Sequence, residues 1–365
     1  MERKRQMKIL IIGFAKIAYM PYIHMYSEMV CDRNIVHVIC WNRDHEKDAE
    51  LENCTIHRFR ANQLDEVAKW KKIGNFLAFK KYVVRELKEI KPDKIVILST
   101  LPAVILSPIL IRWYKERYIF DYRDYTYERF GLFKAIVNCL KENSYATFIS
   151  SDAFREVFNN QNKLYTTHNI LIDSLQYRNV RSRNPRQRTV IRIAFWGFIR
   201  HEEINRKLIE LLAGDCRFEL HYYGREQKSA VGLKKLCLDK KITNVFFHGP
   251  YAPAERYEFA AYTDIIHNIY QNDLQMQKAM GNKYYDGVVM RLPQLCMMGS
   301  YMGQLAEKNG VGLQVELNEY FADTVWNYYQ SLDWDHFDKC TDAEMERICK
   351  EYDDVQKIIG SFSSR

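Results

Sequence analysis

The sequence has 365 residues, of which 47% are hydrophobic and 27% charged, and these values predict a globular chain with two domains or one large one. Its formal net charge of +8 is a mild basic bias. A bias of this size indicates an ordinary solvated surface and argues against a nucleic-acid-binding protein.

Cysteine and histidine usage indicates a cytosolic chain without disulfides or a structural metal. No two of the nine cysteines are spaced C-x-x-C, and no two of the ten histidines are spaced H-x-x-x-H. Cysteines scattered singly are typical of reduced, buried thiols. We therefore expect no protein-held metal ion.

Two apolar stretches bear on export and membrane insertion. The basic residues 1–5 lead into the run 9–12, which is too short for an export signal. The stretch 95–113 is about long enough to span a bilayer, but Pro102 and Pro108 interrupt it. We expect a buried strand, a turn and a helix there, with a transmembrane helix as the weaker alternative.

Short apolar strands alternate with helical segments through the first half of the chain. This alternation is typical of βαβ units and a parallel sheet. The expected strands are 8–12, 35–40, 55–59, 94–98, 117–121 and 147–150, and the expected helices are 66–90, 102–115, 132–144 and 151–159, the last capped by Ser151.

The alternation restarts after an arginine-rich segment, 177–188, which has no apolar periodicity and is the best linker candidate. A tail over 318–361 has helical character. The expected strands are 190–195, 218–223, 245–248, 265–269, 292–297 and 311–315, and the expected helices are 205–213, 229–240, 254–262, 282–290 and 300–309.

These patterns predict two Rossmann-like α/β domains that face each other across a cleft, followed by a helical C-terminal tail. We expect an N-terminal domain over 1–170, a basic linker over 171–189, a C-terminal domain over 190–335 and terminal helices over 336–365. In such folds a ligand binds at the carboxyl ends of the strands.

Glycines follow predicted strands in both halves, at Gly13 and at Gly197, Gly224 and Gly249. A glycine at a strand end lets a phosphate or a base approach the backbone closely, although a tight turn explains each one equally well. The fingerprint G-x-G-x-x-G is absent after Gly13, which disfavours a hydride-transfer enzyme.

The segment from Gly281 to Gly299 is the most informative part of the sequence. A helix beginning at Asn282 would direct its free N–H groups and its positive dipole end at a ligand, and Lys283 adds a charge suited to a diphosphate. Asp286, on the same helix, has the carboxylate that ribose hydroxyls often bind. The alternative is a capped amphipathic helix with surface charges.

Four stretches of the second half are FWGFIRHEEINRKLIELL (195–212), ELHYYGRE (219–226), NVFFHGPYAPAERYEFAAYTDIIHNIY (244–270) and NKYYDGVVMRLPQLCMMGSYMGQLAEKNGVGLQVE (282–316). In this order they resemble the C-terminal domain of GT-B glycosyltransferases, particularly the retaining family four that builds bacterial surface polysaccharides. The first half is similar more loosely, through MKILIIG (7–13) and FDYRDYTYE (120–128).

The resemblance implies roles for individual residues. Asp286 stands where relatives bind the donor ribose, and Arg200 where they hold the diphosphate. Asp124 stands near the expected position of the transferred sugar or the acceptor. We therefore expect catalytic roles for Asp124, Arg200 and Lys283, and donor binding by Gly13, Gly197, Arg200, Gly224, Arg225, Tyr251, Asn282, Lys283 and Asp286.

The sequence also departs from the family pattern. Relatives have two glutamates eight residues apart, whereas here Lys278 takes the first position and Asp286 the second. Arg291-Leu292 replace the glycine expected before Pro293. The donor sugar and the choice between retention and inversion therefore stay open.

The resemblance implies an enzyme that moves a sugar from a UDP- or GDP-linked donor to a glycan or lipid-linked acceptor, without a metal cofactor. Fixed cations and helix N-termini would then stabilise the departing diphosphate. With inversion a base is needed, for which Asp124 is the first candidate, whereas with retention the departing phosphate can take the acceptor proton. A sugar-nucleotide epimerase of the same fold and a catalytically silent binding subunit are the alternatives.

Basic and apolar side chains crowd the predicted helix over 66–90 and predict peripheral docking on an anionic membrane surface. The alternative is a solvated amphipathic helix whose apolar side packs into the protein core. The residues concerned are Lys69, Lys71, Lys72, Lys80, Lys81, Arg85, Lys88 and Lys91, beside Trp70, Phe76, Leu77 and Phe79.

Overall fold

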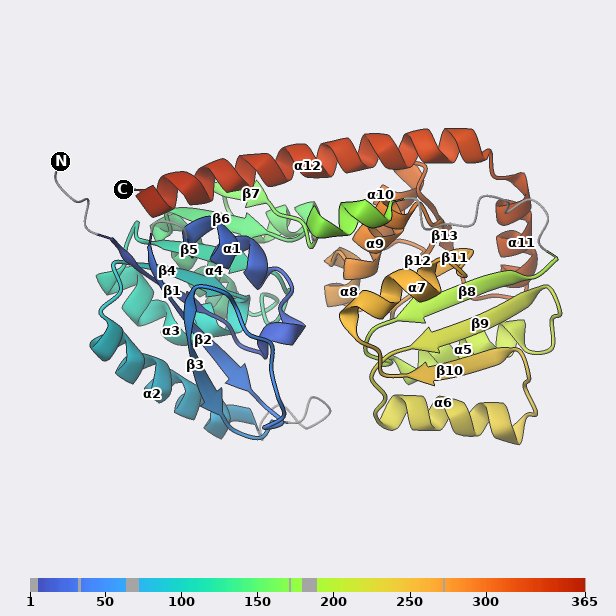
Figure 1. The fold of residues 1–365 in the computed structure, drawn as a ribbon, viewed down its shortest axis with the longest axis horizontal. Coiled ribbons are helices and arrows are strands. Elements are labelled where there is room, and N and C mark those ends of the chain that lie inside the picture. The colour runs from blue at the N-terminus through green and yellow to red at the C-terminus, as the bar shows by residue number, and fades with distance from the viewer. Residues whose placement is uncertain are drawn as a thin grey trace. The chain divides into compact units, whose positions relative to one another are not determined.

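The computed structural model describes residues 6–31, 34–63, 72–170, 172–178, 189–271 and 273–364. The chain divides into two compact units: unit 1 comprises residues 1–169 and 350–365, and unit 2 comprises residues 170–349. Each unit has its own parallel sheet flanked by helices (Figure 1). Each is therefore a Rossmann-like α/β domain.

The sheet of unit 1 has, among the described residues, seven parallel strands in the order β3-β2-β1-β4-β5-β6-β7. Leu10 of the central strand lies opposite His37 on one side and Ile95 on the other. The strands are β1 (Lys8–Ile12), β2 (Ile35–Asn42), β3 (Cys54–Arg60), β4 (Lys94–Leu98), β5 (Tyr118–Tyr122), β6 (Ala146–Ile149) and β7 (Leu164–Thr166).

Helices connect most successive strands of unit 1, but β2 is followed by β3 without one. The stretch 95–113 forms strand β4 and helix α3, as predicted, with Pro108 inside the helix. Along the described parts of the chain, no helix is long and apolar enough to cross a membrane. The helices are α1 (Ile23–Cys31), α2 (Ile73–Ile90), α3 (Thr100–Trp113) and α4 (Gly131–Asn143).

Helix α2 corresponds to the predicted helix 66–90, of which residues 66–71, with Lys69, Trp70 and Lys71, lie outside the described ranges. Its inner face packs into an aromatic core, where the Phe79 ring lies 5.6 Å from that of Trp41 and the Phe76 ring 5.3 Å from that of Phe14. Ile73 and Leu77 are each 56% exposed on the outer side. Of the aromatic residues expected at a membrane, Phe79 therefore belongs to the core, and Phe76 is half-buried beside it.

The sheet of unit 2 has six parallel strands within the described ranges, in the order β10-β9-β8-β11-β12-β13. Side chains of β9 alternate between buried and half-buried, because one face packs against α5 and α6. The strands are β8 (Ile191–Trp196), β9 (Phe218–Tyr223), β10 (Val245–Gly249), β11 (Ile265–Asn268), β12 (Gln294–Met297) and β13 (Gly312–Val315).

The helices of unit 2 include two short ones, α7 and α8. The expected helix over 254–262 is a 3-10 turn at Pro253–Glu255 followed by α7. The helices are α5 (Glu202–Leu212), α6 (Lys228–Asp239), α7 (Arg256–Ala260), α8 (Leu274–Lys278), α9 (Asn282–Met290), α10 (Tyr301–Lys308), α11 (Phe321–Ser331) and α12 (Trp334–Ser364).

The predicted helical tail consists of α11 and the long helix α12, whose last residues belong to unit 1. There the His168 imidazole lies 2.8 Å from the Glu351 carboxylate, and the Tyr145 ring packs on Phe362. Residues 179–188 of the predicted linker lie outside the described ranges, and a 3-10 helix, η4 (Ile172–Tyr177), precedes them.

Four further elements differ from the sequence prediction. Strand β7 and helices α1 and α8 were not expected, and the predicted helix 151–159 is a 3-10 helix, η3 (Asp152–Val157). The expected cap is confirmed, because the Ser151 hydroxyl accepts a hydrogen bond from the Ala153 N–H.

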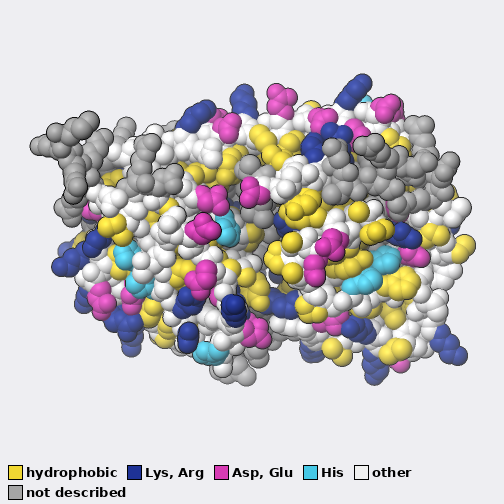
Figure 2. All heavy atoms as spheres, in the orientation of Figure 1, with side chains coloured by type: hydrophobic (Ala, Val, Ile, Leu, Met, Phe, Trp, Pro, Cys, Tyr) yellow, Lys and Arg dark blue, Asp and Glu magenta, His cyan; other side chains and the backbone are white. Residues whose placement is uncertain are grey.

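On the face drawn in Figure 2, basic and acidic side chains are interspersed over both units.

Candidate anion-binding site in unit 2

The strand order of unit 2 reverses between β8 and β11, and this switch point lies at the carboxyl ends of parallel strands, where open α/β sheets bind ligands. The chain segments that leave β8 and β11 and the helix α9 therefore define the region to examine. Five of the ten site residues predicted from the sequence lie in these segments: Gly197, Arg200, Asn282, Lys283 and Asp286.

Gly224 is required by close packing of two strand ends, and Gly197 by its backbone conformation. Both have positive φ angles, +127° and +147°, which side chains with a Cβ rarely adopt. A Cβ on Gly224 would lie 1.6 Å from the carbonyl oxygen of Gly197. Both positions therefore require glycine for structural reasons, whether or not a ligand binds.

Lys283, in the first turn of α9, is only 8% exposed. Its ammonium lies 4.1 Å from the centre of the Phe195 ring and 5.0 Å from that of Tyr270. Among the described residues, no carboxylate forms an ion pair with it. Burial, and next the nearby Arg200, lower its pKa to about 7, whereas Asp286 acts in the opposite direction. A buried cation held only by two rings is suited to an anionic ligand.

Asp286 lies one turn further along α9 and is oriented by two other elements. Its Oδ2 accepts a hydrogen bond of 2.8 Å from the Trp196 indole N–H, and its Oδ1 lies 3.8 Å from a guanidinium nitrogen of Arg256. Burial, and then the Asp286 charge, raise the pKa of Tyr251 to about 12. Asp286 and Tyr251, both predicted from the sequence, are therefore neighbours.

The loop after β8 contributes further polar groups to the same region. Arg200 is exposed, and its charge lowers the pKa of both Lys283 and His201. His201 has a left-handed backbone, φ 60°, and its Nε2 is buried without a hydrogen-bond partner in the described structure. The Arg225 guanidinium lies 4.6 Å from the centre of the Phe198 ring.

Asn282 is the exposed first residue of α9, with Gly281 at the N-cap position. The first N–H groups of a helix and its positive dipole end favour anions. Within the described ranges, no group of three or more His, Cys, Asp or Glu side chains is arranged to hold a metal ion.

Gly13 and Asp124 belong to unit 1, whereas the residues described above belong to unit 2. Gly13 directly follows β1, and a Cβ there would lie 2.5 Å from the end of the Met20 side chain. Asp124 follows β5 and is half-buried, and its carbonyl accepts a hydrogen bond from the Thr100 hydroxyl.

The strand ends of unit 1 also hold a buried cation, Arg123, which is 6% exposed. Its Nε donates to Oδ2 of the fully buried Asp121 at 2.9 Å, and the Tyr26 hydroxyl donates to the same oxygen at 2.8 Å. The guanidinium lies 3.7 Å from the centre of the Tyr22 ring. In this unit the buried cation therefore has its counter-ion within the protein.

Sequence reasoning missed Trp196, Arg256 and His201. Trp196 directly precedes Gly197 and His201 follows Arg200, so their positions at a strand end were a usable signal. No local sequence signal pointed to Arg256, because only the packing of α7 places it near Asp286. Its Nε is also buried without a hydrogen-bond partner among the described residues.

No protein-family model matches the sequence, and no curated protein sequence is similar enough to match it. Solved structures resemble the whole chain. Sucrose-phosphate synthase from Thermosynechococcus elongatus superposes with a TM-score of 0.73 at 11% identity, covering 98% of each chain. Anabaena HepE, solved in complex with UDP and glucose, has a TM-score of 0.70 at 15% identity and covers 99% of this chain and 100% of its own.

A third similar structure is UDP-GlcNAc 2-epimerase from Neisseria meningitidis, bound to UDP-GlcNAc, with a TM-score of 0.53 at 14% identity over 94% of this chain and 100% of its own. At these identities the likeness shows the fold alone. The chain therefore has two Rossmann-like α/β domains of the GT-B type and a C-terminal helix, as its sequence predicted.

Proposed function

We propose that this protein is a glycosyltransferase that transfers a sugar from a UDP- or GDP-linked donor to a glycan or lipid-linked acceptor. The observation that carries the proposal is Lys283, a buried ammonium without an ion-pair partner among the described residues, at the switch point of a GT-B-type domain. The neighbour solved with UDP and glucose supports the same ligand class.

Three groups would stabilise the negative charge that develops on the departing nucleoside diphosphate. They are the Lys283 ammonium, the Arg200 guanidinium and the N–H groups at the start of α9. Fixed donors of this kind need no reorganisation during the reaction, and they lower the barrier by electrostatic stabilisation. In this proposal Asp286 binds the ribose, and turnover requires no divalent cation.

The fate of the acceptor proton separates two mechanisms. With retention, an oxygen of the departing phosphate takes the proton while the acceptor oxygen bonds to the same face of the sugar. With inversion, a carboxylate must take the proton, and Asp124 is the candidate. The resemblance to retaining enzymes favours retention, and the broken glutamate pair at Lys278 weakens that argument.

The direct test is thermal unfolding with UDP, GDP and CDP, because a ligand that binds the folded state raises the unfolding midpoint. At least one nucleotide should raise it, and EDTA should change neither this binding nor sugar transfer. If none of the three shifts the midpoint, the proposal is overturned. If transfer is lost in EDTA and restored by Mg²⁺ or Mn²⁺, the metal-free mechanism is wrong.

An epimerase is the second candidate, because one similar structure is a UDP-GlcNAc 2-epimerase. The two enzymes differ in whether they need an acceptor. An epimerase converts the sugar nucleotide without an acceptor, whereas a transferase releases free nucleoside diphosphate only as the sugar moves to an acceptor or water. Product analysis with donor alone distinguishes them, and a silent binding subunit would give no product in either case.

We further propose a role in surface-polysaccharide synthesis, with peripheral docking on the cytoplasmic face of a membrane. What supports the docking is the outer side of α2, where Ile73 and Leu77 are exposed beside Lys81 and Arg85. Co-sedimentation with phosphatidylglycerol vesicles should exceed that with phosphatidylcholine vesicles and should fall with added salt. Equal recovery in both supernatants at low salt would contradict it.

A further inference from the structure

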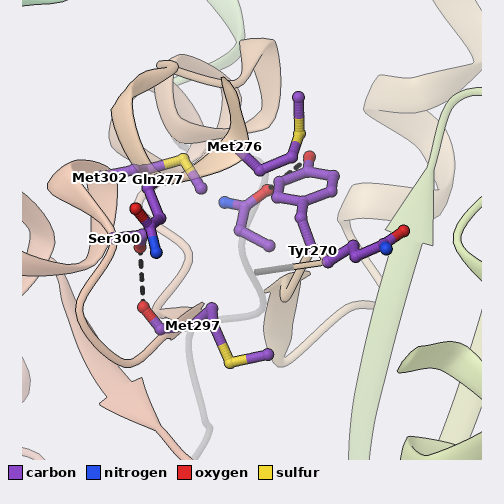
Figure 3. A pocket seen from close by; sticks show the side chains of 8 residues that line it. Tyr270, Met276, Gln277, Met297, Ser300 and Met302 are labelled. Carbon is purple, nitrogen blue, oxygen red and sulfur yellow. Dashed lines mark hydrogen bonds between the residues drawn. The ribbon is translucent and has the colours of Figure 1, made fainter. Parts of the chain in front are cut away.

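A small pocket lies at the carboxyl ends of β11 and β12 in unit 2 (Figure 3). Part of its polar lining already bonds within the protein, because the Ser300 hydroxyl donates to the Met297 carbonyl at 2.7 Å. The pocket has room for about one water molecule. It is therefore too small for a ligand, whereas two cysteines of unit 1 offer reactive groups that the proposed function does not use.

Cys31 and Cys54 bring two thiols into contact in unit 1. Cys31 is the last residue of α1, and Cys54 is the first residue of β3. Their sulfur atoms lie 3.2 Å apart, and no disulfide joins them. Both residues are half-buried, so a small molecule can reach the pair from solvent.

The fold places both thiols at the amino end of strand β2. Helix α1 ends shortly before β2 begins at Ile35, and the Asn34 amide donates to the Val30 carbonyl in the last turn of α1 at 3.0 Å. Cys54 lies opposite Val36 in the ladder between β2 and β3. Because a capped helix end and a strand ladder position the two residues, the contact belongs to the native fold.

Cys40 shows that the contact does not follow from the sequence. It is nearer than Cys54 to Cys31 along the chain, and in an unfolded chain the shorter loop closes at the lower entropic cost. In the fold, however, Cys40 lies four residues along β2 from Val36, the residue opposite Cys54, which is about 13 Å. Its sulfur is buried and faces the Asp48 carboxylate at 3.9 Å.

We propose that Cys31 and Cys54 form an oxidative modification site, which closes to an internal disulfide in the presence of a small disulfide such as oxidised glutathione. The two sulfur atoms must approach by about 1.2 Å to reach the disulfide bond length of about 2.05 Å. Rotation of two short, half-buried side chains supplies a shift of this size. The inference does not depend on the proposed function.

The exchange consumes one oxidant molecule and proceeds in two steps. The Cys31 thiolate attacks a sulfur of the small disulfide, forms a mixed disulfide and releases one thiolate. Cys54 then loses its proton to water and attacks the Cys31 sulfur, which releases the second thiolate. The two protein thiols are thus oxidised to one disulfide, and the small disulfide is reduced to two thiols.

The surroundings of Cys54 suit it to the second step. Burial, and next the neighbouring Cys31 thiol, raise the pKa of Cys54 to about 12, so it is protonated at neutral pH and attacks an oxidant slowly. A mixed disulfide at Cys31 carries no charge and removes the part of this shift that Cys31 causes. Cys54 therefore reacts with the modified Cys31 sooner than with the oxidant.

The bond belongs to a different unit from the proposed nucleotide site. It would join the end of α1 to the start of β3, an edge strand of unit 1, whereas the nucleotide site belongs to unit 2. A cross-link removes conformational freedom from the unfolded chain. The disulfide should therefore stabilise the protein and leave nucleotide affinity unchanged.

Treatment of the native full-length chain with oxidised glutathione, followed by thiol blocking, proteolysis and mass spectrometry, tests the proposal. A peptide pair joined through Cys31 and Cys54 should be the main internal disulfide, and dithiothreitol should remove it. In urea the same treatment should favour a bond from Cys31 to Cys40, because that loop is shorter. The oxidised native chain should unfold at a midpoint about 5–10 °C above that of equally treated Cys54→Ser.

Two variants distinguish the steps. Cys54→Ser should keep a stable glutathione adduct on Cys31, whereas Cys31→Ser should leave Cys54 largely unmodified. Cys139→Ser is the matched control, because Cys139 is an exposed cysteine of α4 and its removal should leave the closure unchanged.

Several results would overturn the inference. One is a native wild-type chain that keeps a glutathione adduct on Cys31 without closing, or in which both thiols stay unmodified. Another is pairing of Cys31 with Cys40 in the native chain. A bond between Cys31 and Cys54 that lowers the unfolding midpoint would show that the native fold does not accommodate it, and would overturn the inference as well.

Discussion

Each of the two domains has a buried cation near the carboxyl ends of its strands, and the two cations differ in their partners. In unit 1, Arg123 has the fully buried Asp121 carboxylate at hydrogen-bond distance and the Tyr22 ring against its face. In unit 2, Lys283 is held by two rings, and its nearest helical carboxylate, Asp286, bonds to Trp196 instead.

The difference separates a structural cation from one suited to a ligand. A buried ion pair is internally neutral, and breaking it is costly because the remaining charge has no partner. A buried cation without a counter-ion destabilises the free protein and gains from any anion that binds. The comparison therefore predicts opposite effects when the two charges are removed.

The largest effect is expected for Arg123→Met, which leaves Asp121 buried without its cation. The free energy of unfolding should fall by about 3–5 kcal/mol. Denaturant titration measures this loss, with Arg112→Met on the exposed side of α3 as the control. Adding Asp121→Asn to the variant should restore part of the stability, and no restoration would contradict the ion-pair interpretation.

Lys283→Met should act in the opposite direction on the ligand-free protein. Removing the unpaired ammonium should raise the free energy of unfolding by roughly 1–4 kcal/mol at pH 6. Nucleotide affinity should fall by about 1.5–3 kcal/mol, because a hydrogen bond to a charged group is lost. Lys207→Met, on the exposed side of α5, should change neither quantity. A destabilised variant with normal nucleotide affinity would show that Lys283 is structural.

Asp286→Ala tests which part of the nucleotide the site binds. It should weaken binding of the nucleoside diphosphate by about 1–3 kcal/mol through the lost ribose hydrogen bonds. Isothermal titration with the nucleotide and with inorganic pyrophosphate tells whether the ribose is involved, since pyrophosphate affinity should change less. Asp239→Ala, at the exposed end of α6, is the control. Unchanged affinities for UDP, GDP and CDP would end the assignment.

The smallest effect is the change in stability over a single pH unit just above pH 7, which Lys283 of unit 2 should produce. The folded-state pKa of Lys283 is about 7, below its ordinary value of 10.5, so between these values the unfolded chain binds more protons. Relative to Lys283→Met, the ligand-free protein should therefore gain stability as the pH rises from about 7, by up to about 1.4 kcal/mol per unit. The buried thiols Cys40 and Cys54, whose pKa values are raised to about 12, oppose this gain once thiols of the unfolded chain begin to ionise. Nucleotide affinity should fall over the same range, and both trends should be absent in Lys283→Met.

The sequence by itself determined the elements whose signal is local. Strands 8–12 and 218–223 and the helix 282–290 have the predicted bounds, because short apolar runs and helical spacing need no distant partner. The predicted fold class follows from their alternation. Strand β7 and helix α8 were missed because they are only three and five residues long, too short for any periodicity.

Only the tertiary structure decided what the charged residues of the site contact. Asp286 and Lys283 are conspicuous in the sequence, but the Trp196 that bonds to Asp286 is 90 residues away, and its position depends on how β8 and α9 dock. In the same way, the sequence alone does not show that Arg123 has a counter-ion whereas Lys283, among the described residues, has none. Burial and the distance to a carboxylate set that difference, and both are properties of the packed chain.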